Sequence, residues 1–121
     1  MNRERRRESR FSSKNLISYV CLDENNQKYG QGMGRTLNIS EMGILLETHV
    51  LVDPKSTISL TIALEEELVD FDGRIAFSNK KKDGKYETGV HFIAQNAEKR
   101  RFLRHYITVF KKHMMSNRGD G

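Results

Sequence analysis

The sequence predicts a mainly β domain: a six-stranded antiparallel β-barrel with a C-terminal α-helix and a flexible, basic N-terminal arm. Three observations lead to this prediction. Short segments between residues 13 and 94 alternate apolar and polar residues with the period of two that marks half-buried strands. After Gln95 the apolar spacing becomes helical, and the first ten residues hold five arginines. A closed barrel is favoured because closure removes exposed strand edges.

The length of 121 residues fits one domain. Four segments are expected: a basic arm over 1–12, the barrel over 13–94, the helix over 95–114 and a disordered tail over 115–121. The single cysteine, Cys21, has no disulfide partner within the chain, which favours a reducing compartment. The sequence has neither the apolar core of a signal peptide nor a run long enough to cross a bilayer. We therefore expect a cytoplasmic protein without membrane insertion.

Turn residues separate the expected strands. Strand character is expected at 15–22, 32–40, 43–52, 57–64, 68–78 and 86–94. The fourth segment alternates strictly, with one face made of Ile58, Leu60, Ile62 and Leu64. The fifth repeats the pattern with Val69, Phe71, Ile75 and Phe77, and Gly73 is expected at a bulge or bend. The glycines of 30–34 are expected at turn and bulge positions.

The C-terminal segment predicts an amphipathic helix. Its apolar positions are Leu103, Tyr106, Ile107, Phe110 and Met114. Asn96 is the expected N-cap, and lysines near the end of the segment suit a helix C-terminus. The helix is expected to cover one opening or one side of the barrel.

The charge of the chain is concentrated at its start. The net charge is +5, and residues 1–14 hold six basic side chains against two acidic ones. A localised basic segment indicates an anionic partner, which can be nucleic acid, phospholipid or a phosphorylated small molecule.

The sequence contains no residue pattern that indicates a catalytic site. The four histidines form no pair with metal-ligand spacing, and none lies near Cys21 in the sequence. The glycines of 30–34 do not complete a G-x-G-x-x-G pattern, since Arg35 stands where the last glycine belongs. We therefore expect no enzyme, no catalytic residue, no metal site and no cofactor.

The segment NISEMG, residues 38–43, is the strongest local signal. Asn38 and Ser40 are two apart, so on an extended backbone their side chains project to the same face. An amide beside a hydroxyl can read the edge of a planar ring or hold a phosphate oxygen. Gly43 can supply a positive-φ turn or a close backbone approach. On these six residues alone, a simple turn between two strands is the favoured interpretation.

The arginines change that balance. Arg6 and Arg10 form R-x-x-x-R just before Phe11 and the first strand, and the N-x-S-x-x-G segment follows. The two motifs in this order, at the front of a small β-rich domain, resemble the PilZ domain family. The segment GVHF, which begins at Gly89, resembles that family's closing G-x-x-F element. The resemblance covers residues 5–113.

The resemblance implies a receptor for cyclic di-GMP, a bacterial second messenger with two guanines and two phosphates. It implies that Arg6 and Arg10 bind phosphate and the guanine O6/N7 edge, with Arg5 and Arg7 adding stacking or charge. Arginine suits this role because its planar fork pairs two acceptors at once and stacks on a base. The resemblance further implies that the ligand-binding residues on the barrel are Asn38, Ser40 and Gly43, with Gly89 as a possible addition.

Several points stay open at this stage. Arg3 and Arg7 form a second R-x-x-x-R; we favour Arg6 and Arg10 because Arg10 directly precedes Phe11. One or two ligand molecules can be bound. The expected mechanism is ordering of the arm on binding, which presents a changed surface to a protein effector in motility or biofilm regulation. The alternatives are a PilZ-like adaptor that binds no nucleotide and, less favoured, a nucleic-acid-binding barrel.

Overall fold

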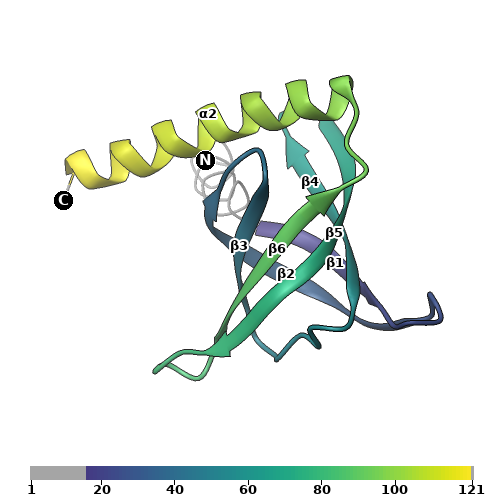
Figure 1. Ribbon diagram of the computed structural model, residues 1–121. Coiled ribbons are helices and arrows are strands. Elements are labelled where there is room, and N and C mark those ends of the chain that lie inside the picture. The colour runs from purple at the N-terminus through teal and green to yellow at the C-terminus, as the bar shows by residue number, and fades with distance from the viewer. Residues whose placement is uncertain (1–15, 121) are drawn as a thin grey trace, which may run out of the picture.

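The computed structural model of the protein describes the backbone of residues 16–120 and the side chains as far as Met114. It confirms the predicted six-stranded antiparallel barrel with one C-terminal helix (Figure 1). The elements are β1 (Leu16–Leu22), β2 (Lys28–Ile39), β3 (Gly43–Thr48), β4 (Thr57–Leu64), β5 (Glu67–Lys80), β6 (Tyr86–Ile93) and α2 (Ala97–Asp120). The strand order is β1-β2-β3-β6-β5-β4, and β1 pairs with β4 to close the barrel. The expected basic arm, with Arg5, Arg6, Arg7 and Arg10, lies outside the described residues.

The barrel interior is filled by the apolar side of each alternating strand. In β4 the buried side chains are the four that the sequence predicts: Ile58, Leu60, Ile62 and Leu64. From β1 the interior receives Ile17, Tyr19 and Cys21, and from β6 it receives Val90 and Phe92. The period of two in the sequence therefore marks the inward face of the barrel directly.

The strand pairing shifts register at three places: one lies between Cys21 and Leu22, where β1 pairs with β2, and the other two are β-bulges beside the groove described below. The register of β2 on β3 shifts between Thr36 and Asn38, and that of β5 on β6 shifts between Ile75 and Phe77. The second bulge corrects one expectation: Phe77 leaves the inward face and is 40% exposed. The bulge expected at Gly73 is therefore wrong, because Gly73 pairs in regular register with Ile58 and Phe92. An extra residue turns every following side chain to the other face of the sheet.

The glycines of 30–34 lie inside β2, so the expected turn positions are wrong, whereas the bulge expectation is met in part: Gly30 pairs with Cys21 beside the register shift between β1 and β2. Gly32 packs against the ring of Tyr19 on β1, where an added Cβ would stand 3.0 Å from the tyrosine hydroxyl. Gly34 lies close to β3 in the same way, 3.3 Å from the carbonyl oxygen of Glu47. These glycines allow close packing within a strand, and glycine in a strand often marks such an approach.

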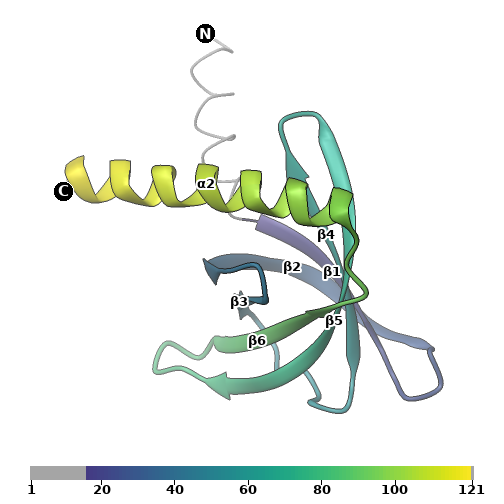
Figure 2. The same ribbon diagram turned by 45° about the horizontal axis from the view of Figure 1, so that its top comes forward.

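Helix α2 lies across one end of the barrel, and its C-terminal half extends beyond the strands (Figures 1 and 2). The predicted N-cap is confirmed, because Asn96 Oδ1 accepts a hydrogen bond from the Lys99 amide at 2.8 Å. The buried side chains of the helix are Phe102, Leu103, Tyr106, Phe110 and His113. The helix is longer than predicted: it continues to Asp120 where a tail was expected from residue 115. Met114, the last apolar position predicted for the helix, is instead 37% exposed, so among the described side chains the packed part of the helix ends at His113.

Candidate binding groove on the barrel

A groove of about 320 Å³ lies on the outer surface of the barrel, where β2, β3, β5 and β6 meet. Its lining residues are Asn38, Ile39, Ser40, Gly43, Ile44, Leu45, Ala76, Phe77, Gly89, Val90 and His91. The barrel order places β3 between β2 and β6, with β5 beyond. The fold therefore brings together the four described residues that the sequence proposed for the site: Asn38, Ser40, Gly43 and Gly89.

Asn38 and Ser40 are both exposed at this groove, on the face predicted from their spacing. The Oδ1 atom of Asn38 accepts a hydrogen bond from the Ile39 amide at 2.9 Å. The Ser40 Oγ accepts from the amides of Met42 and Gly43 at 3.2 and 3.3 Å. The turn interpretation of this segment is thus correct for Ser40. Both side-chain oxygens accept from nearby backbone amides, which leaves the amide N–H groups of Asn38 and the hydroxyl proton of Ser40 as donors.

Gly43 and Gly89 are required by close approach, not by a left-handed backbone. A Cβ on Gly43 would lie 2.3 Å from the carbonyl oxygen of Val90, so β3 and β6 cannot pair this closely with any other residue there. A Cβ on Gly89 would lie 2.5 Å from the ring of Phe77. Of the two roles considered for Gly43, the close approach is the one observed.

Phe77 and His91 are groove residues that the sequence did not indicate. Phe77 faces outward because of the bulge at Ala76, and its ring lies over Gly89. His91 is exposed, and its backbone pairs with Gly43 on one side and Arg74 on the other. The only signal in the sequence for Phe77 was its place in an alternating strand, which pointed to the interior. Its pairing with Gly89, which leaves room for the ring, joins two distant strands and cannot be read from the sequence.

A charged cluster adjoins the groove along β3. Glu47, whose side chain is 9% exposed, accepts hydrogen bonds from Lys81 and, at 3.1 Å, from Arg35 Nε. Lys85 lies 4.0 Å from the same carboxylate. These hydrogen bonds from Lys81 and Arg35 hold the Glu47 pKa well below its ordinary value, at about 2. Lys81 also lies 3.8 Å from the Asp83 carboxylate, so carboxylates offset most of the positive charge of this cluster.

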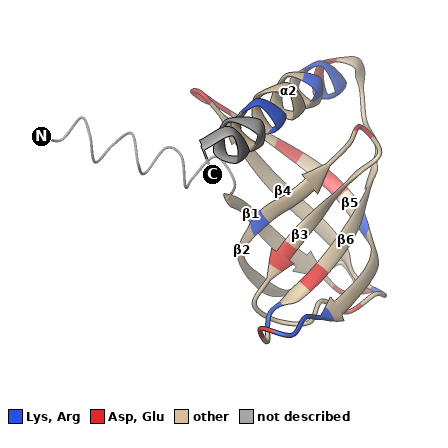
Figure 3. Cartoon of the chain, turned by 90° about the vertical axis from the view of Figure 1, so that its left-hand side faces the viewer, with Lys and Arg blue, Asp and Glu red and all other residues tan. Residues whose placement is uncertain are grey.

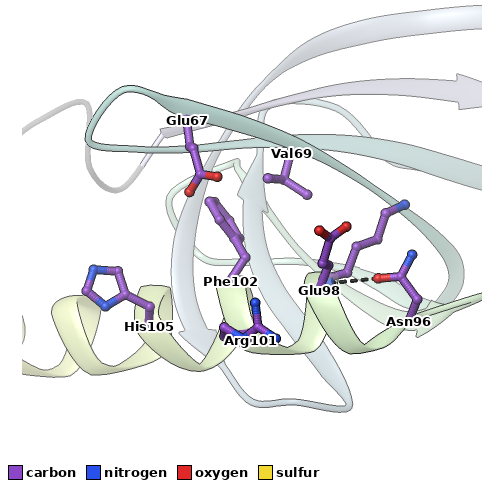
Figure 4. A pocket seen from close by; sticks show the side chains of 8 residues that line it. Glu67, Val69, Asn96, Glu98, Arg101, Phe102 and His105 are labelled. Carbon is purple, nitrogen blue, oxygen red and sulfur yellow. Dashed lines mark hydrogen bonds between the residues drawn. The ribbon is translucent and has the colours of Figure 1, made fainter.

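A larger hollow of about 500 Å³ lies elsewhere, between β5 and the first turns of α2 (Figure 4). Its floor includes Val69 and Phe102, while Glu67 and Glu98 face the same space as the basic side chains of the helix. It contains none of the residues of the N-x-S-x-x-G segment. The carboxylates of Glu67 and Glu98 offset the positive charge of Lys99 and Arg101 there, so the hollow gives an anion no net attraction and the smaller groove is the better candidate for a phosphorylated ligand.

Within the described residues, no group of three or more histidine, cysteine or acidic side chains is placed to hold a metal ion. Cys21 is buried, and burial raises the pKa of its thiol. In the part of the chain that the structure describes, no helix is both long enough and apolar enough to cross a membrane.

Comparison with known proteins settles the family. A sequence model of the PilZ domain matches residues 4–108. The chain belongs to the PilZ domain family. PilZ domains are regulatory binding domains, not enzymes, and the family binds cyclic di-GMP.

Among solved structures, this PilZ chain is similar to MrkH of K. pneumonia in its apo state, with a TM-score of 0.55 and 12% sequence identity. The match covers 88% of this chain and 50% of MrkH, so the chain spans half the length of that protein. At this identity the likeness shows the fold alone. No curated protein matches the sequence significantly.

Proposed function

We propose that this PilZ domain is a receptor for cyclic di-GMP, which binds in the groove between β2, β3, β5 and β6. The observation that carries the proposal is the convergence in one groove of Asn38, Ser40 and Gly43 with Gly89 of β6. These residues are the described part of the motifs on which the resemblance to the family rests. No lysine or arginine is among the described residues that line the groove, so the cations for the two phosphates have to come from outside it.

The groove offers three kinds of contact to a guanine nucleotide. The amide N–H groups of Asn38 suit acceptors such as the guanine O6 and N7 atoms or a phosphate oxygen. The Ser40 hydroxyl can donate to a neighbouring phosphate oxygen. The ring of Phe77 presents an exposed aromatic surface on which a purine can stack. Leu45 and Gly89 keep the rest of the groove apolar and close to the backbone.

The arginines of the arm can reach this groove. Leu16, the first residue of β1, pairs with Arg35 on β2, so the chain enters the barrel near the end of β2 that leads into Asn38. Arg10 precedes Leu16 by six residues, and six residues span at most about 20 Å. We propose that Arg6 and Arg10 close over the nucleotide and pair with its phosphates and guanine edges, assisted by Arg5 and Arg7. Arginine is the residue suited to both contacts.

The signal that follows is a change of surface. Binding that draws the arm onto the barrel expends part of its free energy on ordering, and it creates a surface that only the bound receptor presents. We propose that a protein effector recognises this surface. The adaptor alternative, in which the barrel works through protein contacts without nucleotide, lacks a reason for the donors that meet in the groove.

Isothermal titration calorimetry with cyclic di-GMP tests the proposal. Arg10→Ala is expected to weaken binding by about 1.5–3 kcal/mol, or about 10- to 150-fold, because charged hydrogen bonds are lost. Asn38→Ala is expected to weaken binding by about 3- to 10-fold, because its hydrogen bonds are neutral. The matched controls are Arg101→Ala on α2 and Asn79→Ala on β5, both exposed and outside the groove, and both are expected to bind as the wild type does.

Three results would contradict the proposal. Equal affinity of wild type and Arg10→Ala for cyclic di-GMP would mean that Arg10 of the arm does not contact the nucleotide. Absence of any binding heat would favour the nucleotide-free adaptor. Binding of DNA or RNA that declines steeply with added salt, with no preference for cyclic di-GMP, would favour the nucleic-acid alternative.

A further inference from the structure

A second hollow of about 320 Å³ lies between the β2–β3 turn and the start of α2. We call it the turn–helix hollow; its lining residues are Glu41, Met42, His91, Phe92, Ala94, Gln95 and Arg100. Met42 is 66% exposed, an unusual position for a large apolar side chain, whereas Phe92 at the floor is only 6% exposed. An exposed methionine at the rim of a hollow that has both apolar and charged lining residues is typical of surfaces that bind protein segments.

The turn that carries Met42 is held firmly. The Met42 carbonyl accepts a hydrogen bond from the Phe92 amide at 2.9 Å. The neighbouring Glu41 accepts one from Gln95 Nε2 at its carbonyl, at 3.2 Å, and its carboxylate lies 3.3 Å from Arg104 Nε. Met42 therefore projects from a turn that is fixed on both sides, and its exposure is a property of the folded turn.

The helix beside this hollow is strongly basic, and we call its side next to the hollow, which carries Arg100 and Arg104, the basic face. Residues 97–114 carry six lysines and arginines against one glutamate, a net charge of +5, whereas residues 16–96 carry eight against twelve, a net charge of −4. Figure 3 shows the basic positions along α2 and acidic positions on the barrel strands. Among the described residues, Arg104 with Glu41 is the one ion pair between an exposed arginine or lysine of this face and a carboxylate. Like charges three and four residues apart destabilise a helix, so an anionic partner would relieve this face.

The surroundings of the basic face select the kind of anion. The acidic β4–β5 turn flanks the helix, as the 3.7 Å contact of His105 with Glu65 shows, and Glu41 lies on the side of the hollow. A duplex nucleic acid or a flat anionic membrane is wide enough to meet these carboxylates and be repelled. It also gains nothing from Met42 and Phe92. A narrow acidic protein segment with one apolar side chain avoids the repulsion and uses the apolar contact.

We propose that the turn–helix hollow docks an acidic segment of a partner protein, with an apolar side chain against Met42 and carboxylates on Arg100 and Arg104. The Arg104–Glu41 pair is exposed on both sides, at 62% and 49%, and exposed pairs contribute little, so a partner carboxylate can replace Glu41. His91 lines both this hollow and the nucleotide groove, and the same turn carries Ser40. Dependence of docking on nucleotide rests on the proposed function, whereas docking itself does not.

Fluorescence anisotropy on the full chain tests the docking with three labelled probes. These are a short helical peptide with leucines on one stripe and glutamates elsewhere, the same peptide with serine for leucine, and a short DNA duplex. The leucine–glutamate peptide is expected to bind about tenfold more tightly than either of the other two. Arg100→Glu and Met42→Ser are each expected to weaken it by about tenfold. The matched control Lys112→Glu, the same reversal of charge farther along the helix, is expected to change it by about twofold or less.

Each contrary result overturns the docking proposal. Equal binding of the leucine and serine peptides, tighter binding of the duplex, an equal effect of Lys112→Glu, or no peptide binding would each do so. Calorimetry with cyclic di-GMP on Met42→Ser and Arg100→Glu separates the two proposals, because neither residue lines the nucleotide groove. Unchanged nucleotide affinity with lost peptide binding supports the docking site. If the wild type binds no nucleotide, the peptide measurements still decide the docking.

Discussion

The two hollows that flank β5 differ in what forms them. The hollow between β5 and α2 is the larger, about 500 Å³ against about 320 Å³ for the outer groove. Its acidic and basic side chains, however, offset each other's charge. The outer groove is shaped by two glycines that allow strands and an aromatic ring to approach closely. Its polar groups are donors fixed by their own turn. Volume alone therefore does not identify a binding site in this fold; convergent and pre-oriented groups do.

The largest expected effect is that of Gly43→Ala, which tests whether close strand approach builds the groove. An added Cβ would lie 2.3 Å from the Val90 carbonyl oxygen, so β3 and β6 would have to separate. We expect a loss of about 3 kcal/mol or more in the free energy of unfolding, measured in urea, and loss of nucleotide binding.

Gly30→Ala is the matched control for this substitution. No atom lies within 4 Å of the Cβ it would add, so we expect a change within about 0.5 kcal/mol. Similar unfolding free energies for the two variants would show that the approach at Gly43 does not shape the barrel.

The charged edge of the groove predicts the next effect, through Glu47→Gln. Arg35 and Lys81 would lose their carboxylate, and we expect a loss of about 1–3 kcal/mol in unfolding free energy at neutral pH. Because the Glu47 pKa is lowered from 4.5 to about 2, its contribution is complete above about pH 4.5 and is lost as the pH falls towards 2. The difference between wild type and variant should therefore shrink over that interval.

Urea unfolding of both proteins between pH 7 and pH 2 measures this difference. Glu66→Gln in the β4–β5 turn is the control, since Glu66 makes no ion pair with any described residue. A gap between wild type and Glu47→Gln that stays constant across the acid range would contradict the assigned ion pairs.

A smaller effect is expected for Phe77→Ala, which separates stacking from hydrogen bonding in the groove. Loss of one aromatic contact to a base should weaken cyclic di-GMP by about tenfold in calorimetry. The control is Leu68→Ala, an exposed apolar residue on the same strand but outside the groove. If both substitutions leave the affinity unchanged, the nucleotide does not stack on Phe77.

The smallest effect is expected in the larger hollow. Glu98→Gln alters the charge of that hollow without touching the groove, so the affinity for cyclic di-GMP should change by about twofold or less. Titration calorimetry under the same buffer and salt measures it. A tenfold change would mean that the hollow at α2 takes part in nucleotide binding after all.

Local patterns in the sequence predict most of this fold and part of its site. Alternation in 57–64 places the side chains of β4 correctly, and the spacing of Asn38 and Ser40 predicts their shared face. The site residues that the sequence missed depend on contacts between distant strands. Phe77 belongs to the groove because Gly89 leaves room for its ring, and no local sequence pattern links these two residues. The end of α2 was missed because the apolar spacing from which it was predicted stops before the helix does.

The two β-bulges beside the groove make the site depend on the exact number of residues in β2 and β5. One stands at Leu37, just before Asn38, and the other at Ala76, just before Phe77. Each bulge turns the next side chain to the outside of the barrel. The exact number of residues in β2 and β5 therefore determines whether the amide of Asn38 and the ring of Phe77 face the groove. Removing Leu37 or Ala76 would exchange inside for outside at these positions. A one-residue deletion in the β1–β2 loop would not change which side chains of β2 and β5 face outward. A deletion at either bulge is therefore expected to abolish nucleotide binding, whereas a deletion in that loop is expected to leave it intact.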